Sequence, residues 1–354
     1  MYFWGLEEPM EKIKVLLVDD SAIVREVLTS ELGRDPQINI VGTAPDAFIA
    51  RDKILKLAPD VVLLDIEMPR MDGLTFLRRL MHYKPLPVII VSSLTEPGGQ
   101  MALDAIRAGA VDVACKPGPG LPLADMTEIL LAKIKAAFQI KPETLSSSDL
   151  DVPDALPTLS FEGPSRRIVA MGASTGGTQA LEHILGRFPA DAPPTLIVQH
   201  MPAYFTASFA KRLDSLCAME VREAADGDVV RQGLALIAPG NRHMLLRRRE
   251  SSLVVQIKDG PMVYHQRPSV EVLFQSVAKC KDVRVAAALL TGMGSDGAEG
   301  LLALRQQGAY TLAQDRASCV VFGMPAEAIK LGAAVEIAPL RRIPELLLQH
   351  ASEA

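Results

Sequence analysis

Three aspartates in the first third of the chain could together hold a cation. Asp19 and Asp20 end the apolar run "KVLLVDD", and Asp65 follows the apolar run "DVVLL". The carboxyl ends of neighbouring parallel strands meet at one edge of a sheet, so these carboxylates are expected to converge there. Carboxylates that close repel one another unless a cation intervenes, and an oxygen-only pocket suits a hard ion such as Mg²⁺.

Two further residues could offer partners to an anionic group on Asp65. Ser92 ends the apolar run "LPVIIVS", and Lys116 directly follows "VDVAC". A metal ion, an ammonium and a hydroxyl around one carboxylate suit an aspartate that accepts a phosphoryl group. Each aspartate taken singly is more often a turn or helix-capping residue, but that explanation is weak for the whole set.

A serine, a histidine and an aspartate in the second half could form a hydrolytic triad. Ser174 lies in "GASTGG", which fits the G-x-S-x-G pattern of an exposed hydroxyl at a strand-to-helix turn. A serine that only caps the following helix is the alternative. His200 directly follows "TLIVQ", and Asp296 closes the segment "VRVAAALLTGMGS", so all three are expected at one sheet edge. In this interpretation His200 takes the serine proton and Asp296 orients the imidazole.

Two other histidines compete with His200 as the base. His183 lies inside the helical segment that follows Ser174. His350 would be the base if the chain followed the order serine, acid, histidine of the α/β-hydrolases. Its segment, "RRIPELLLQHASEA", is typical of a short amphipathic cap, so His200 is preferred.

The loop that carries Asp296 permits a different interpretation. Residues Gly292 to Gly297, "GMGSDG", fit the G-x-G-x-x-G fingerprint of a dinucleotide-binding loop, and Asp315 lies about where a ribose partner would be. Too few residues follow the loop for the remaining units of a dinucleotide-binding fold. Asp296 would also repel a pyrophosphate, by about 1 kcal/mol at 4 Å even in water. NAD binding is therefore kept only as a minor alternative.

Alternating strand and helix patterns indicate two α/β domains in a chain of 354 residues. Residues 12–140 predict a flavodoxin-like domain with a five-stranded parallel sheet of order 2-1-3-4-5. Residues 141–166 are rich in Pro, Ser and acidic residues and predict a linker. Residues 167–350 predict a doubly wound α/β domain with strands at "RIVAMG", "PTLIVQHM", "GLALIAPG", "VRVAAALLTG" and "AYTLAQD". Arg247 to Arg249 lie in a predicted hairpin between "HMLL" and "SLVVQIKDG".

Composition limits the classes of partner. The formal net charge of −5 gives no basic footprint for nucleic acid. The sequence contains neither an apolar stretch long enough for a membrane span nor the pattern of a signal peptide. Four scattered cysteines predict neither a zinc site nor a disulfide framework, which favours a cytoplasmic protein.

The first domain resembles the receiver domains of response regulators, on the order of Asp19 and Asp20, Asp65, Ser92, and Lys116 with Pro117. The resemblance implies that a histidine kinase phosphorylates Asp65 and that Ser92 and Lys116 contact the phosphoryl group. It also implies a Mg²⁺ site made of Asp19, Asp20, Asp65 and the Glu67 carbonyl.

One position departs from the receiver pattern. Receivers commonly carry an aromatic residue three places before the lysine, whose rotamer reports phosphorylation, and this chain has Val113 there. The aromatic part of the usual switch is therefore not expected. Val113 also supports an alternative of another class, a receiver-bearing adaptor whose triad is vestigial.

The second domain resembles the catalytic domain of the chemotaxis protein-glutamate methylesterases, CheB. The motifs that carry the resemblance span it nearly end to end: "GASTGG", "QHMP", "LIAPGNRHM", "RPSVEVLF", "LLTGMGSDG" and "SCVVFGMP". The resemblance implies that Ser174 is the nucleophile, His200 the general base and Asp296 the orienting acid. It further implies that the Met293 backbone N–H is an oxyanion donor.

The function that this resemblance implies is a hydrolase activated by phosphorylation. It would remove methyl groups from glutamate γ-methyl esters on chemoreceptors, releasing methanol, and would deamidate certain glutamines there, giving adaptation in chemotaxis-type signalling. The esterase reaction is expected to need no cofactor. In the family's resting state the receiver covers the active edge, and phosphorylation loosens that contact.

Overall fold

The computed structural model describes residues 12–93, 95–116, 123–140, 158–161 and 167–352. The chain divides into two compact units, one made mainly of residues before Ser147 and the other mainly of Ser147–Ala354. Of the predicted linker, only residues 158–161 are described. In that stretch the Leu159 N–H donates to the Arg187 carbonyl at 2.9 Å and Phe161 is buried, both within the second unit.

The first unit contains a five-stranded sheet of order β2-β1-β3-β4-β5, as predicted, and all its paired strands are parallel. Its strands are β1 (Ile13–Val18), β2 (Ile38–Ala44), β3 (Val61–Leu64), β4 (Val88–Ser92) and β5 (Asp112–Cys115). Its helices are α1 (Ala22–Leu32), α2 (Ala47–Leu57), α3 (Gly73–Tyr83) and α5 (Leu123–Phe138), and α4 (Glu96–Arg107) lies between β4 and β5 in the chain, with residues 94–103 grouped with the second unit.

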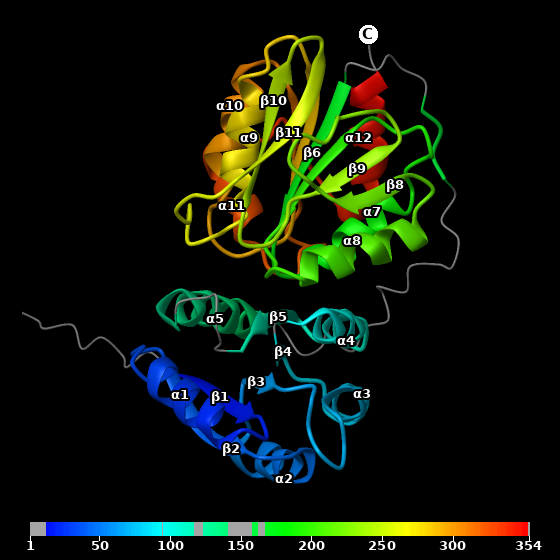
Figure 1. Cartoon of the computed structure of the whole chain (residues 1–354). Coiled ribbons are helices and arrows are strands. Elements are labelled where there is room, and N and C mark those ends of the chain that lie inside the picture. Colours follow the sequence, from blue (N-terminus) through cyan, green and yellow to red (C-terminus); the bar gives the residue numbers. More distant parts are fainter. Residues whose placement is uncertain (1–11, 94, 117–122, 141–157, 162–166, 353–354) are drawn as a thin grey trace, which may run out of the picture. The chain divides into compact units, whose positions relative to one another are not determined.

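Capping residues begin three of these helices directly after the loops that follow the strands. Ser21, Asp46 and Asp72 each accept a hydrogen bond from a backbone N–H in the first turn of α1, α2 and α3. Strands β3, β4 and β5 are buried at every position, which is typical of a parallel sheet covered on both faces. Helices α1 and α5 pack together beside the sheet (Figure 1).

The second unit contains a seven-stranded parallel sheet of order β14-β13-β12-β6-β7-β9-β8. The strands are β6 (Arg167–Ala173), β7 (Thr195–Gln199), β8 (Glu220–Glu223), β9 (Leu234–Ile237), β12 (Arg284–Leu289), β13 (Tyr310–Gln314) and β14 (Glu336–Ala338). The helices are α7 (Gly177–Leu185), α8 (Phe205–Leu216), α9 (Val270–Ala278), α10 (Ala298–Gln306), α11 (Met324–Lys330) and α12 (Ile343–Ser352), with a 3₁₀ turn at Leu340–Arg342.

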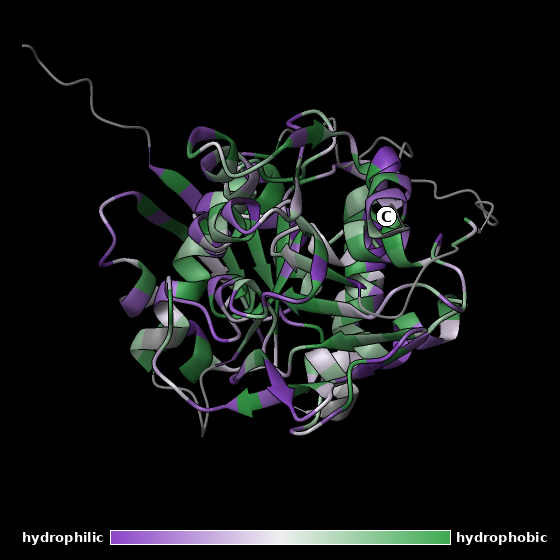
Figure 2. Ribbon diagram, turned by 90° about the horizontal axis from the view of Figure 1, so that it is seen from above, coloured by the Kyte–Doolittle hydropathy of each residue, from purple (hydrophilic) through white to green (hydrophobic). Residues whose placement is uncertain are grey.

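Helices cover both faces of this sheet, so the predicted doubly wound architecture is confirmed. Helices α9, α10 and α11 pack on one face, and α7, α8 and α12 lie on the other (Figure 1). In Figure 2 many strands are coloured as hydrophobic, whereas the helices mix hydrophobic and hydrophilic residues. The helices therefore bury one side each against the sheets.

Two strands of the second sheet were not predicted. Both β8 and β14 lie at an edge and are short, and their sequences "EVRE" and "EIA" contain no apolar run. Short edge strands bury little surface, so their sequences need no hydrophobic pattern.

The predicted hairpin is present as a separate antiparallel pair, β10 (His243–Arg249) with β11 (Ser252–Lys258). Its three arginines, Arg247 to Arg249, are exposed. Among the described residues, no helix is long and apolar enough to cross a membrane.

Candidate functional site

In the first unit, the strand register brings Asp19 and Asp65 together. Val18 lies opposite Leu64 in the parallel pairing of β1 and β3, so the next residue on each strand leaves the sheet at the same point. The Asp65 N–H continues this ladder and donates to the Val18 carbonyl at 2.8 Å. Both aspartates are therefore placed by backbone pairing rather than by loop conformation.

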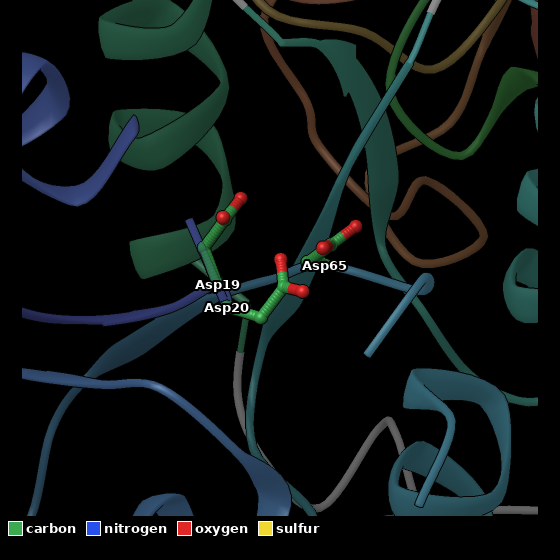
Figure 3. A group of neighbouring side chains, drawn as sticks. All are labelled: Asp19, Asp20 and Asp65. Carbon is green, nitrogen blue, oxygen red and sulfur yellow. The ribbon is translucent and has the colours of Figure 1, made fainter. Parts of the chain in front are cut away.

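Three carboxylates gather at this edge, as predicted. Oxygen atoms of Asp19, Asp20 and Asp65 all lie within 4.8 Å of one another, and Figure 3 shows the three side chains side by side. Asp19 and Asp65 are 3% and 1% exposed, whereas Asp20 is exposed. A set of carboxylate oxygens at this spacing fits a hard divalent cation.

Lys116 is the one ammonium recorded at this cluster among the described residues. Its Nζ lies 2.7 Å from Asp65 Oδ2 and 3.0 Å from Asp19 Oδ2. Burial acts to lower the pKa of Lys116, but the hydrogen bonds and charges of Asp65 and Asp19 outweigh it and the pKa is raised. Lys116 is therefore held as a cation.

For Asp65, in contrast, the surroundings disfavour the charged form. Burial raises its pKa to about 6, against the lowering effect of Lys116, and the charge of Asp19 adds to the rise. A second positive charge at the cluster would favour the ionised form of Asp65. Lys116 and the Arg25 guanidinium, which donates to the Asp19 and Asp20 carbonyls, do not balance the three carboxylates. The remaining negative charge suits a bound cation.

The other described residues predicted for this site come from the loop after β3 and from β4 and β5. The Ser92 hydroxyl is fully buried and has no hydrogen-bond partner in the described part of the chain. The Lys116 N–H donates to the Ser92 carbonyl at 2.8 Å, so the residue that ends β4 lies beside the residue that follows β5. Glu67 approaches Asp65 through its N–H, which donates to Oδ1 at 3.1 Å. Val113 is buried in β5, and Pro117 lies outside the described residues.

In the second unit, the same register rule places Ser174 beside His200. Ala173 lies opposite Gln199 in the pairing of β6 and β7, and Ser174 and His200 are the residues that follow. The His200 N–H donates to the Ala173 carbonyl at 3.0 Å. Both side chains are buried, with Ser174 8% and His200 4% exposed.

Asp296 joins His200 from the neighbouring strand on the other side of β6. It lies in the loop between β12 and α10, and its Oδ2 is 2.8 Å from His200 Nε2. A carboxylate can only accept this bond, so Nε2 carries the proton and Nδ1 is left as the acceptor. That Nδ1 is buried and has no partner among the described residues. An imidazole in this state is prepared to take a proton from a hydroxyl.

The capping alternative for Ser174 is wrong. Helix α7 begins at Gly177 and its N-cap is Gly176, with no hydrogen bond from a side chain. The backbone of Ser174 is fixed instead, since its N–H donates to the Thr291 carbonyl at 3.0 Å and its carbonyl accepts from Gly177 at 2.7 Å. The sharp turn leaves the hydroxyl out of the helix.

The glycine loop after β12 lies against this serine. A Cβ on Gly292 would come within 2.6 Å of the Ser174 Cβ, so only glycine allows this approach. The Met293 N–H donates to no acceptor in the part of the chain that the structure describes. The loop therefore meets Ser174 through its backbone.

The other interpretations of these residues do not match the geometry. His183 lies within α7, and His350 stacks on Tyr310, the first residue of β13, which places it at the opposite edge of the parallel sheet. Asp315, the suggested ribose partner, accepts hydrogen bonds from Ser318 in a local turn. Asp296 is engaged with His200, so the glycine loop belongs to the Ser–His–Asp arrangement.

Sequence reasoning missed two residues that hold the site in place. The buried Gln199 amide donates to the Ser174 carbonyl at 2.9 Å. Thr291 donates its hydroxyl to the Thr175 carbonyl at 2.9 Å and accepts from the Ser174 N–H through its own carbonyl. The sequence did contain a signal that could have indicated both residues. Gln199 and Thr291 are each a polar residue directly after an apolar run.

Two family models match the chain. The family model of the CheB methylesterase matches residues 169–347, and that of the response regulator receiver domain matches residues 15–127.

Individual relatives cover nearly the whole chain. A protein-glutamate methylesterase/protein-glutamine glutaminase of Syntrophus aciditrophicus is 54% identical over 96% of this chain and 99% of its own length. One from Pseudomonas aeruginosa is 49% identical over 96% and 97%. The solved CheB methylesterase catalytic domain of Thermotoga maritima is 36% identical, with a TM-score of 0.51 over 52% of this chain and 99% of that domain. The chain belongs to the CheB methylesterase family and carries a response regulator receiver domain before the methylesterase domain.

Proposed function

We propose that this protein hydrolyses glutamate γ-methyl esters and deamidates specific glutamines on chemoreceptors, under control of phosphorylation by a histidine kinase. The observation that carries the proposal is the shared register of β6 and β7, which sets Ser174 beside a His200 already bonded to Asp296 at 2.8 Å. The names of the near-full-length relatives support the substrate class. We assign residues 12–140 to the receiver, 141–166 to a linker and 167–350 to the catalytic domain.

In the first half of the reaction, Ser174 loses its proton to His200 Nδ1 while Oγ attacks the ester carbonyl carbon. The Met293 N–H donates to the oxyanion that forms, and a donor of this kind typically contributes about 3 to 4 kcal/mol. When the intermediate collapses, His200 returns the proton to the leaving oxygen and methanol departs. From a glutamine side chain, ammonia departs in the same step.

In the second half, water replaces the leaving group. It gives a proton to His200 Nδ1 and attacks the acyl carbon, and the collapse returns that proton to Ser174 and frees the glutamate. Asp296 stabilises the imidazolium in both halves. The proposed chemistry uses no cofactor.

In the receiver, Asp65 accepts the phosphoryl group, and Ser92 and Lys116 bind its oxygens. Asp19, Asp20, Asp65 and the Glu67 carbonyl would hold Mg²⁺, which neutralises the charge that builds up during phosphoryl transfer. The 4.8 Å cluster of carboxylate oxygens and the raised pKa of Asp65 support this assignment.

The test is methanol release from methylated receptor membranes. Ser174→Ala and His200→Gln should reduce release to background, because each removes a group that forms or breaks bonds. His183→Gln is the matched control, a second histidine of the same domain, and should retain wild-type release. If the wild type released no methanol, a binding adaptor with a vestigial triad would be the better description.

A further inference from the structure

Helix α9 holds the Asp296 carboxylate from the side of its first turn. Among the described residues, four hydrogen bonds are donated to this carboxylate, and one of them comes from His200. The Ser269 hydroxyl donates to Oδ1 at 2.8 Å, the Glu271 N–H to Oδ1 at 3.0 Å and the Val270 N–H to Oδ2 at 2.7 Å. These backbone N–H groups belong to the first turn of a helix, where no helical carbonyl is available to them.

These hydrogen bonds replace the solvation that the buried carboxylate has lost. Ser269 and Val270 are fully buried, and Asp296 is 2% exposed. A buried carboxylate remains charged only when donors compensate for lost solvation, and a helix N-terminus adds favourable potential. Three of these four donors come from α9 and its cap, so the position of the Asp296 carboxylate is determined mainly by this helix.

The direction of the Ser269 hydroxyl is determined by a second contact. Its oxygen accepts a hydrogen bond from the Val272 N–H at 3.3 Å, as an N-cap does. Since the N–H supplies that proton, the hydroxyl's own proton is directed to Asp296. Ser269 therefore links the helix cap to the triad acid.

A second histidine fixes Ser269 from the other side. The Ser269 N–H donates to His243 Nδ1 at 3.3 Å, so Nδ1 carries no proton and Nε2 donates to the Pro261 carbonyl at 2.9 Å. His243 is buried, at 5% exposed. The result is a continuous series of hydrogen bonds from His243 through Ser269 and Asp296 to His200.

We propose that Ser269 is a positioning residue for the triad, and that His243 holds it in place. The inference rests on the proposed function and deepens it. Without the hydroxyl, Oδ1 keeps a single donor and the carboxylate can rotate, which moves Oδ2 from His200. The cost falls on the chemical step, because Ser269 contacts Asp296 and not the ester.

The decisive variants are Ser269→Ala and Ser269→Gly. Both remove the donor to Asp296, but glycine is tolerated at an N-cap far better than alanine, so the two differ in helix stability. We expect kcat for methanol release to fall by about tenfold in both, the effect of losing one hydrogen bond to a charged group, with KM within twofold of wild type. A kcat that followed stability instead, with Ser269→Gly close to wild type, would overturn the proposal.

Ser276→Ala is the matched control on the same helix. Ser276 is also buried, and its hydroxyl accepts from the Leu246 N–H at 2.8 Å and donates to the Leu273 carbonyl at 2.7 Å. It makes no contact with Asp296, so kcat should remain within twofold of wild type. Equal losses of kcat in Ser276→Ala and Ser269→Ala would show that Ser269 contributes only to packing and has no positioning role.

A second readout separates this inference from the proposed substrate. A fluorophosphonate reacts with an activated serine whatever the natural substrate is, and Ser174→Ala gives the background. Ser269→Ala should slow this reaction by about tenfold. Methanol release by the wild type together with unchanged labelling of Ser269→Ala would refute the positioning role and leave the function standing. Slowed labelling without methanol release in the wild type would do the reverse.

Discussion

Asp65 must satisfy two demands that oppose each other. It is 1% exposed, and burial raises its pKa to about 6, yet its proposed role as phosphoryl acceptor and metal ligand requires the ionised form. Lys116 offsets part of the cost at 2.7 Å. The negative charge that Lys116 leaves unbalanced is the reason to expect a divalent cation at this cluster.

Mg²⁺ binding should therefore depend on pH around 6. The pKa of Asp65 is raised from 3.8, so below about pH 6 the ion must displace a proton and its affinity falls as the pH is lowered. Between pH 7 and pH 5 the association constant should drop by about tenfold, which follows from a single proton with a pKa near 6. Calorimetric titration at the two pH values measures this ratio.

The control for this prediction is Asp65→Asn. Its affinity should be weaker at both pH values, and its ratio between them should be smaller than that of the wild type. A wild-type affinity that stayed constant from pH 7 to pH 5 would contradict the raised pKa.

At the scale of elements, the turn between β6 and α7 decides where Ser174, the proposed nucleophile, lies. Gly176 adopts a φ of +78°, a conformation that favours glycine, and ends the turn that begins at Ser174. A Cβ at this position would lie 2.5 Å from the Val320 Cβ and 3.3 Å from the Thr291 Cγ2. The turn is thus shaped both by backbone conformation and by close packing.

Gly176→Ala should cost both stability and activity. Backbone strain alone costs about 1 to 2 kcal/mol, and the clash with Val320 adds a similar amount. Because the turn must shift, methanol release should fall by more than the loss of folded protein explains. Urea unfolding and the rate per folded molecule measure the two effects.

Gly308→Ala provides the comparison. Gly308 also has a positive φ, of +83°, but a Cβ there would meet nothing within 4 Å. Gly308→Ala should therefore lower the free energy of unfolding only by the cost of backbone strain, and its rate of methanol release should equal that of the wild type. If both variants behaved alike, packing around Gly176 would have no part in forming the turn.

At the scale of the whole molecule, a receiver and a methylesterase domain share one chain, and they use the same edge of their sheets. Asp19 and Asp65 follow β1 and β3, and Ser174 and His200 follow β6 and β7, in each case one residue past a paired position. A coupling between two sites is a free energy, commonly 1 to 3 kcal/mol. The charge that one phosphoryl group adds to Asp65 is large enough to supply a coupling free energy of this size.

Phosphorylation should raise esterase activity by roughly 5- to 150-fold, the range of such couplings. In Asp65→Asn, acetyl phosphate and Mg²⁺ should no longer raise the esterase activity. The basal rate should remain, because Asp65 is not part of the proposed esterase site. Asp52→Asn, an exposed carboxylate on α2, should respond as the wild type does. Activation that persisted in Asp65→Asn would place the control site elsewhere.

Most of the fold could be predicted from the sequence, because apolar strands and amphipathic helices alternate with a clear period. All five strands of the first sheet, their order and the central strands of the second sheet are confirmed. The edge strands β8 and β14 were missed, since strands that bury little surface need no apolar pattern.

The sequence by itself determined which polar and ionisable residues come directly after strands. A polar residue at the end of an apolar run must leave the sheet at its carboxyl edge, so Ser174, His200, Asp19 and Asp65 could be named without coordinates. The tertiary structure alone decided which atoms meet. It selected Nε2 of His200 for Asp296, and it brought Ser269 and helix α9 to that carboxylate, because contacts between distant segments depend on packing that no local pattern records.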